Sequence, residues 1–308
     1  MADIVISEFM DEAIVRSAFA GRDVIYDPTL VDRPADLAAA VADARALVVR
    51  NRTQVRGALL AAAPRLRVVG RLGVGLDNID VDACKARGIT VRPATGANDV
   101  SVAEYVITAM LVLLRRAWFA TPDVLAGRWP RMSTIGGEVS GRTLGLIGLG
   151  AIARETAHRA RAMGMNIVAH DPHLAPGHDA WRLAARRELE ALLAEADVVS
   201  LHVPLTTETR HMLGTGNLAR MKRGAILVNA ARGGVVDEAA LAETLRSGHL
   251  GGAALDVFER EPLDAAGAQV FAGVPNLLLT PHIAGVTEES NVRVSDVTAR
   301  AVLAELRD

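Results

Sequence analysis

The stretch TLGLIGLGAIA, residues 143–153, decides the fold of this chain. It is a short apolar run that ends in Gly148–x–Gly150–x–x–Ala153, and a helical pattern follows. In such a sequence the first glycine allows a tight turn, and the second lets the backbone approach a pyrophosphate. A small third residue permits close packing of helix on strand, and alanine is a permitted variant there. The stretch therefore predicts the strand–turn–helix unit of a dinucleotide-binding domain.

The start of the next helix and the end of the next strand extend this prediction. The backbone amides of Ala151 and Ile152 would be free at a helix N-terminus, where the helix dipole favours a phosphate. Asp171 ends the next apolar run, where a carboxylate accepts a hydrogen bond from an adenosine ribose. Its charge would repel the extra phosphate of NADP, so NAD is the expected cofactor. A structural turn followed by a surface aspartate is the alternative.

Apolar runs of strand length alternate with helical patterns on both sides of this motif. They lie at 3–7, 24–26, 46–49, 66–70 and 89–91, and again at 143–150, 166–171, 197–204, 225–229, 251–258 and 276–281. Buried strands that alternate with helices indicate parallel sheets covered on both faces. A long helical segment, 99–129, interrupted at Pro122, separates the two sets, and a final helix is expected at about 286–306.

Composition excludes several classes of protein. The net charge of −2 over 308 residues gives no general attraction to nucleic acid or to anionic lipid. All but two of the 34 basic residues are arginines, so anion binding falls to arginine. The single cysteine, Cys84, excludes an intrachain disulfide and a multi-cysteine metal site, and no metal site is predicted.

No targeting or membrane segment is expected. The first twelve residues, MADIVISEFMDE, contain acidic residues and no basic region of the kind a signal peptide has. The longest apolar runs, 106–114 and 144–153, are well short of the roughly 18 residues of a membrane-spanning helix. We therefore expect a cytoplasmic protein.

Seven motifs, in sequence order, resemble the signatures of the D-isomer-specific 2-hydroxyacid dehydrogenases. They are VGRLGVGLDNID (69–80), NDVSVAE (98–104), GLIGLGAIARE (145–155), LHVPLTTETRHML (201–213), NAARGGVVDE (229–238), ALDVFEREP (254–262) and TPHIAG (280–285). Within that family the chain is most similar to the catalytic part of D-3-phosphoglycerate dehydrogenases, and the resemblance runs from about residue 47 to 285.

The resemblance implies an α/β protein with two doubly wound parallel-sheet domains, Rossmann- or flavodoxin-like, and an active-site cleft between them. Residues 1–98 plus 284–308 would form the substrate domain, and residues 99–283 the NAD-binding domain. The catalytic trio of the family falls on Arg232, Glu261 and His282.

General chemistry accounts for the three residue types. Reduction of a 2-oxo acid needs a proton for the developing alkoxide, and His282 can supply it because imidazole titrates near working pH. Glu261 would favour the charged imidazolium. Arg232 can hold the substrate carboxylate and polarise the carbonyl with its fork of donors.

The resemblance also implies further contacts. Asp256 would contact the nicotinamide amide, and backbone amides near Val74 and Gly75 would bind the substrate carboxylate as an anion nest. The full set of expected cofactor-binding residues is Gly148, Gly150, Ala151, Ile152, Asp171, His202, Val203, Pro204, Ala230, Asp256, His282 and Gly285. Packing residues or a plain turn are the alternatives at several of these positions.

Arg50 and Arg71 match positions that, in phosphoglycerate dehydrogenases, look toward the substrate phosphate. They suggest a substrate with a second anion, such as 3-phosphoglycerate or sulfolactate, although solvated surface arginines are an equal alternative. The chain ends at Asp308, so serine control through a C-terminal regulatory domain is not expected. Glyoxylate, hydroxypyruvate and other simple 2-oxo acids also stay open.

The helical region 99–129 corresponds to the dimer interface of the family, so a homodimer is expected. Two alternative functions fit the sequence less well. A non-enzymatic NAD-sensing corepressor shares this fold, but no peptide-docking appendage is visible in the sequence. An adenosylhomocysteinase-like hydrolase would require a longer chain and a catalytic lysine motif.

Overall fold

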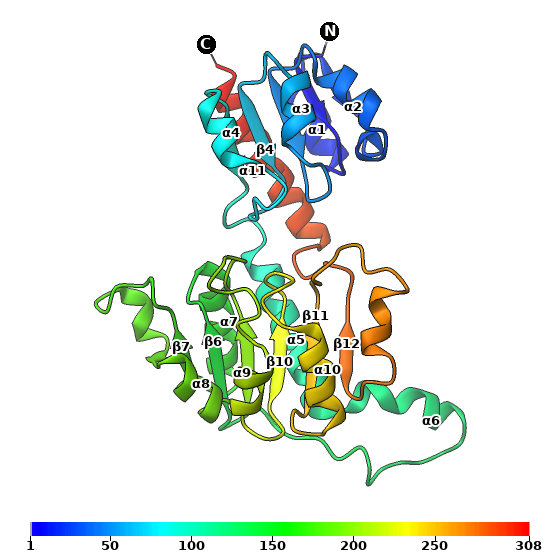
Figure 1. Cartoon of the computed structure of the whole chain (residues 1–308), viewed down its shortest axis with the longest axis vertical. Coiled ribbons are helices and arrows are strands. Elements are labelled where there is room, and N and C mark those ends of the chain that lie inside the picture. Colours follow the sequence, from blue (N-terminus) through cyan, green and yellow to red (C-terminus); the bar gives the residue numbers. More distant parts are fainter. Residues whose placement is uncertain (1, 308) are drawn as a thin grey trace. The chain divides into compact units, whose positions relative to one another are not determined.

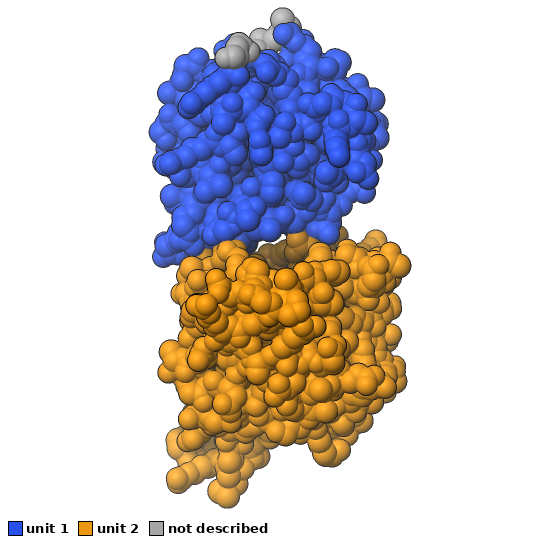
Figure 2. All heavy atoms as spheres, turned by 90° about the vertical axis from the view of Figure 1, so that its left-hand side faces the viewer, with its two compact units in different colours: residues 1–98, 286–308 blue, residues 99–285 orange. Residues whose placement is uncertain are grey.

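The computed structural model describes residues 2–307 and divides the chain into two compact units. Unit 1 comprises residues 1–98 and 286–308, and unit 2 comprises residues 99–285 (Figures 1 and 2). The second boundary therefore lies two residues after the one expected from the sequence. Both units contain only parallel strand pairs, which confirms the predicted α/β architecture of two parallel-sheet domains.

Unit 1 contains a five-stranded sheet in the order β2-β1-β3-β4-β5. The strands are β1 (Ile4–Ile6), β2 (Val24–Tyr26), β3 (Ala46–Val49), β4 (Val68–Arg71) and β5 (Thr90–Pro93). Every residue of β1 and β3 is buried, as their continuous apolar sequences predict. This strand order is the flavodoxin-like one, in which the order reverses between β1 and β3.

Helices cover both faces of this sheet. They are α1 (Glu12–Ala18), α2 (Pro34–Val41), α3 (Gly57–Ala62), α4 (Val81–Ala86) and α11 (Glu288–Glu305), with a 3₁₀ turn at Leu30–Asp32. Side chains of α1 and α11 enter one core with β1, β3 and β4, whereas α2, α3 and α4 contribute to the core on the other face. The C-terminal helix α11 thus belongs to the N-terminal unit (Figure 1).

Unit 2 contains a seven-stranded sheet in the order β12-β11-β10-β9-β6-β7-β8. The strands are β6 (Thr143–Ile147), β7 (Asn166–His170), β8 (Ala185–Arg186), β9 (Val198–Leu201), β10 (Ile226–Asn229), β11 (Gly252–Leu255) and β12 (Leu277–Leu279). The order reverses between β6 and β9, which is the point where doubly wound sheets bind dinucleotides.

Two layers of helices cover the sheet of unit 2, with α5 and α7 packed on one face and α8, α9 and α10 on the other, and α6 belongs to neither layer. The helices are α5 (Asp99–Arg115), α6 (Thr121–Leu125), α7 (Ala151–Ala162), α8 (Leu189–Glu195), α9 (Thr215–Arg220) and α10 (Glu238–Arg246), with 3₁₀ turns at Ala117–Ala120, Asp179–Arg182 and Gly267–Phe271.

The long helical segment differs from its prediction. The helix α5 ends at Arg115, and Arg116 adopts a left-handed backbone conformation with φ of 54°. Pro122 does not interrupt a helix, because it lies in the first turn of α6, where proline is tolerated. The prediction of one helix broken at Pro122 is therefore wrong. The break comes six residues earlier.

Candidate functional site

The glycine turn lies at the carboxyl end of β6, where the strand order of unit 2 reverses. Gly148 has φ of +89°, and a Cβ atom there would lie 2.5 Å from the carbonyl oxygen of His202. Only glycine fits that position. At Gly150 an added Cβ would meet no atom within 4 Å, so the backbone faces open space. This is the arrangement a pyrophosphate needs.

The first turn of α7 also fits a phosphate. Gly150 is its N-cap, and no side chain caps the helix, so the amides of Ala151 and Ile152 are not taken by a capping side chain. Asp171 follows β7, and its carboxylate accepts hydrogen bonds from the amides of Leu149 (2.9 Å) and His173 (3.0 Å). It therefore fixes the glycine turn and keeps acceptor capacity for a ribose hydroxyl. The residues present fit a dinucleotide such as NAD.

The residues after β9 and β10 surround the same edge of the sheet. His202, Val203 and Pro204 follow β9, and Ala230 follows β10. The imidazole of His202 contacts the hydroxyl of Ser200 at 3.0 Å, and burial lowers its pKa to about 4. His202 is thus neutral at physiological pH and adds no charge to this edge.

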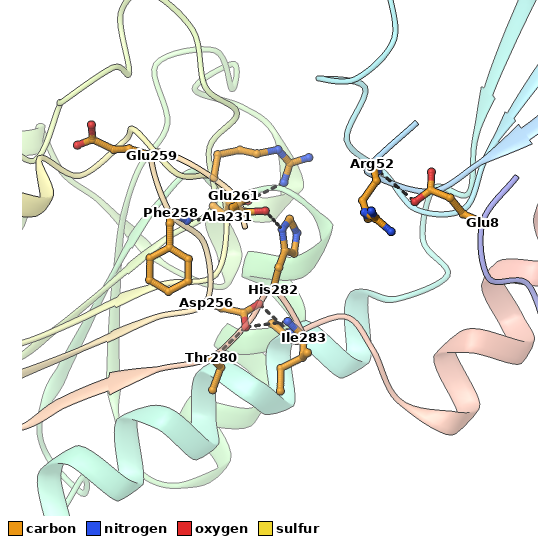
Figure 3. A network of polar contacts seen from close by, with 12 residues as sticks. Glu8, Arg52, Ala231, Asp256, Phe258, Glu259, Glu261, Thr280, His282 and Ile283 are labelled. Carbon is orange, nitrogen blue, oxygen red and sulfur yellow. Dashed lines mark hydrogen bonds and ion pairs between the residues drawn. The ribbon is translucent and has the colours of Figure 1, made fainter. Parts of the chain in front are cut away.

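A histidine–glutamate pair lies at the carboxyl ends of β11 and β12. The Nδ1 atom of His282 is 2.7 Å from Oε2 of Glu261 (Figure 3). The other carboxylate oxygen, Oε1, accepts a hydrogen bond from the amide of Phe258 at 3.1 Å. Burial alone would raise the pKa of Glu261, but the hydrogen bond and charge of His282 outweigh burial and lower it. The carboxylate is therefore ionised and holds one ring nitrogen of His282.

Arg232 lies in the loop after β10, and close packing brings this loop against the one that carries Glu261. A Cβ atom at Gly233 would fall 1.7 Å from the carbonyl oxygen of Phe258, so only glycine allows the contact. Asn229 fixes the turn, since its side chain donates to the carbonyl of Arg232 (2.9 Å) and accepts from the amide of Ala231 (3.1 Å). The charge of Arg232 also helps to lower the pKa of Glu261. The structure thus brings the predicted trio together within unit 2.

Asp256 is completely buried, and its carboxylate is occupied by protein donors. It accepts hydrogen bonds from the hydroxyl of Thr280 (2.6 Å) and from the amides of Ile283 (2.8 Å) and Ala284 (2.7 Å) (Figure 3). Its contact with a nicotinamide amide stays a prediction. Gly285 ends unit 2, directly after this segment.

In unit 1, Arg50 follows β3 at the point where the strand order reverses. Its guanidinium lies over the ring of Phe9 (5.7 Å from carbon to ring centre) and donates to Oδ1 of Asn291 at 2.8 Å. Burial lowers the pKa of Arg50. The buried carboxylate of Glu8 accepts hydrogen bonds from the amides of Arg50, Arg52 and Thr53 and so shapes the turn. Figure 3 shows the contact with Arg52. Nothing in the sequence had singled out Glu8, Phe9 or Asn291, which lie far from Arg50 in the chain.

Arg71 ends β4 and folds back over its own loop. Its Nη1 donates to the carbonyl of Leu72 at 2.8 Å, and a Cβ atom at Gly73 would lie 1.6 Å from that nitrogen. Within residues 2–307 the amides of Val74 and Gly75 donate no hydrogen bond to protein acceptors, and Val74 is exposed. Both amides are thus available to an anion, as the nest interpretation requires.

The described residues offer neither a metal-binding cluster nor a membrane-spanning helix. Residues 2–307 hold no group of three or more histidine, cysteine, aspartate and glutamate side chains that could bind a metal ion. No helix in this range combines the length and apolar character that crossing a membrane requires.

Comparisons with known proteins agree with this geometry. Residues 107–284 match the family model of the D-isomer specific 2-hydroxyacid dehydrogenase, NAD binding domain. The chain is 56% identical over 299 residues to (S)-sulfolactate dehydrogenase of Chromohalobacter salexigens, which covers 97% of this chain and 96% of that protein.

Two further relatives are more distant. Identity to D-3-phosphoglycerate dehydrogenase of Archaeoglobus fulgidus is 41% over 258 residues, which is 84% of this chain. This chain matches about half of that relative, 49% of its length. The crystal structure of D-lactate dehydrogenase from Aquifex aeolicus, complexed with NAD and lactic acid, superposes with a TM-score of 0.86 at 29% identity. It covers 98% of this chain and 95% of the other.

Proposed function

The chain belongs to the D-isomer specific 2-hydroxyacid dehydrogenases, and from this premise we propose that it interconverts a small 2-hydroxy acid with a second anionic group and the corresponding 2-oxo acid, with NAD as cofactor. The observation that carries the proposal is the 2.7 Å contact between His282 and Glu261 beside Arg232, in the same unit as the glycine turn. Sulfonate is the second anion we favour, because the sulfolactate relative matches nearly the whole chain.

The residues of unit 2 divide the chemistry among them. Glu261 holds Nδ1 of His282, so Nε2 is the atom that gives a proton to the substrate oxygen during reduction and takes it back during oxidation. Arg232 orients the substrate carboxylate and polarises the carbonyl. NAD, when bound, supplies or accepts the hydride at C2 of the substrate.

In unit 1, Arg50 and Arg71 would recognise the second anion, and the amides of Val74 and Gly75 the carboxylate. Arginine forks suit sulfonate and phosphate oxygens. The (S) label of the sulfolactate relative agrees with a D-type geometry. In sulfolactate the CH₂–sulfonate group takes priority over the carboxylate, because sulfur ranks above oxygen, whereas the methyl group of lactate ranks below the carboxylate. The same spatial arrangement is therefore (R) in lactate and (S) in sulfolactate.

A kinetic panel with NADH tests the proposal. Sulfopyruvate, phosphohydroxypyruvate, hydroxypyruvate and glyoxylate are compared in the native protein and in Arg50→Ala, Arg71→Ala and the exposed control Arg65→Ala. We expect Arg50→Ala and Arg71→Ala to lower kcat/KM for sulfopyruvate and phosphohydroxypyruvate, which carry a second anionic group, far more than for glyoxylate. Equal losses on all four substrates would refute the second-anion subsite, and no NADH oxidation with any of them would refute the function.

The segment after α5 would form the interface of a homodimer. Leu125, Trp129 and Met132 are 83%, 79% and 77% exposed, an apolar surface that a second copy of the chain would cover. The side chains of Ala117 and Trp118 lie outside what the structure describes. Sedimentation analysis should find a dimer that Leu125→Glu dissociates and that Val81→Glu, at an exposed site of unit 1, leaves intact. A monomeric native protein would refute the assignment.

A further inference from the structure

The side chains of Tyr105, Thr280 and Asp256 form a chain of hydrogen bonds that leads to the segment carrying His282. The hydroxyl of Tyr105, on α5, is 2.6 Å from Oγ1 of Thr280, which follows β12. The hydroxyl of Thr280 in turn is 2.6 Å from Oδ1 of Asp256, which follows β11. Neither Tyr105 nor Thr280 has a role in the function proposed above.

The direction of the hydrogen bonds follows from counting protons. Oδ1 of Asp256 also receives the amide of Ile283, so it acts as an acceptor. Thr280 has one hydroxyl proton and donates it to Asp256. The proton between Tyr105 and Thr280 must then come from Tyr105. Burial raises the pKa of Tyr105 to about 12, so this donor is kept across the physiological pH range.

Asp256 determines the shape of the segment that carries the proposed catalytic histidine. Its carboxylate accepts the amides of Ile283 and Ala284, and its backbone carbonyl accepts the amide of His282 at 2.8 Å. His282 has φ of 57°, a left-handed conformation that is costly for a residue with a side chain. Such a conformation persists only where its surroundings enforce it. Asp256 supplies the enforcing contacts.

We propose that Tyr105 and Thr280 are positioning residues of the reaction, acting through Asp256 to hold His282 in its left-handed conformation against Glu261. This inference rests on the proposed function, because it assumes that His282 transfers the proton. Tyr105 orients the hydroxyl of Thr280, Thr280 fixes the carboxylate of Asp256, and Asp256 fixes residues 282–284. Neither positioning residue touches the reacting atoms.

The test compares variants that remove single hydroxyl groups. Tyr105→Phe should lower kcat about threefold and Thr280→Val about tenfold, since the second bond is made to a charged group. The double variant should be no slower than Thr280→Val alone, because Tyr105 acts only through Thr280. Thr280→Ser keeps the hydroxyl and should restore most of the activity. Tyr26→Phe and Thr244→Val are the matched controls. In the native protein the hydroxyl of Tyr26 donates to the carbonyl of Met10, and the hydroxyl of Thr244, on α10, donates to the carbonyl of Ala240.

Hydrogen exchange of the peptide spanning 280–285 gives a readout that does not depend on turnover. Exchange at the amides of Ile283 and Ala284 should accelerate in Tyr105→Phe and Thr280→Val but not in the controls. Unchanged exchange and kcat in Tyr105→Phe, or losses that multiply in the double variant, would overturn the inference. Faster exchange with no loss of turnover would mean that the hydrogen bonds stabilise the segment without affecting the reaction, and it would also overturn the inference. If Thr280→Val does not fold, the comparison of Tyr105→Phe with Tyr26→Phe decides. An inactive native protein refutes the proposed function and leaves the exchange result interpretable.

Discussion

Replacement of Glu261 by glutamine tests the proposed proton transfer most directly. The carboxylate accepts on both sides, from the amide of Phe258 and from Nδ1 of His282. A glutamine must place its oxygen toward the amide of Phe258, because the reverse orientation sets two donors against each other. Its NH₂ group then faces Nδ1, which must give up its proton. The imidazole becomes neutral, with its only proton on Nε2.

The size of the effect follows from the contacts that are lost. The side chains of His282 and Glu261 are 36% and 30% exposed, so we take the lower end of the 1.5–3 kcal/mol of a charged hydrogen bond, about 1.5 kcal/mol or tenfold. A neutral imidazole is a much weaker acid for reduction, and with its proton on Nε2 it cannot accept one for oxidation. We expect this second loss to add about tenfold more, which brings the total to the lower end of the roughly 10²–10⁴-fold that general acid–base catalysis contributes. kcat should fall about 100-fold in both directions.

The assay is steady-state NADH absorbance in both directions, with Glu259→Gln as matched control. Glu259 is a neighbour in sequence, its side chain is 39% exposed, and its Oε1 lies 3.1 Å from a different histidine, His211. The control should keep kcat within about twofold, as expected of a surface ion pair. A Glu261→Gln enzyme that retains a third of its activity would refute the reasoning, as would an equal loss in Glu259→Gln.

Three further predictions follow from the geometry. Gly148→Ala should lower the melting temperature because its Cβ meets the backbone of His202, whereas Gly150→Ala should fold normally and bind NADH at least tenfold more weakly; equal NADH titrations for Gly150→Ala and the native protein would contradict this. Asp171→Ala should raise KM for NADH and reduce the preference for NADH over NADPH. An unchanged ratio of kcat/KM for NADH to kcat/KM for NADPH would speak against the ribose contact. Hydrogen bonding to Arg45, with the charge of Arg22, lowers the pKa of Asp3 below 3.8, so its stabilisation is complete above that pH and is lost as pH falls through the folded-state pKa. Asp3→Asn should therefore lower the melting temperature by about 2 °C near pH 7 and by less near pH 3, and a pH-independent difference would contradict the ion-pair account.

Local sequence was sufficient for most of the strands and for the glycine turn. The apolar run at 46–49 is β3 residue for residue, and all of it is buried because strands inside a parallel sheet are covered on both faces. The run at 24–26 is β2 residue for residue, although β2 is an edge strand whose Ile25 is exposed. The glycine turn could be placed because it depends on only a few consecutive residues, among which Gly148 has a positive φ. The break at Arg116 had no such signal, since nothing in the neighbouring sequence requires a left-handed residue.

Contacts between distant residues could not be read from the sequence. Asn291 reaches Arg50 across 241 positions, and Tyr105 reaches Thr280 across 175. The sequence offered a chemical hint: Tyr105 begins the mostly apolar stretch YVITAMLVLL of α5, and a buried tyrosine usually finds a hydrogen-bond partner. That rule predicts that a partner exists without saying where it lies.

Asp256 shows why a motif residue can have a further role besides the cofactor contact predicted for it. Burial of its charge is unfavourable and raises its pKa, yet three donors converge on it from Thr280, Ile283 and Ala284. An asparagine would turn its NH₂ group toward at least one of these donors, and an apolar residue would leave two buried amides unpaired. An ionised carboxylate, which accepts on both oxygens, is therefore the side chain that lets residues 282–284 adopt this path. Aspartate is thus required at position 256 even without a bound cofactor. Without Asp256, His282 would not hold the conformation in which its ring contacts Glu261.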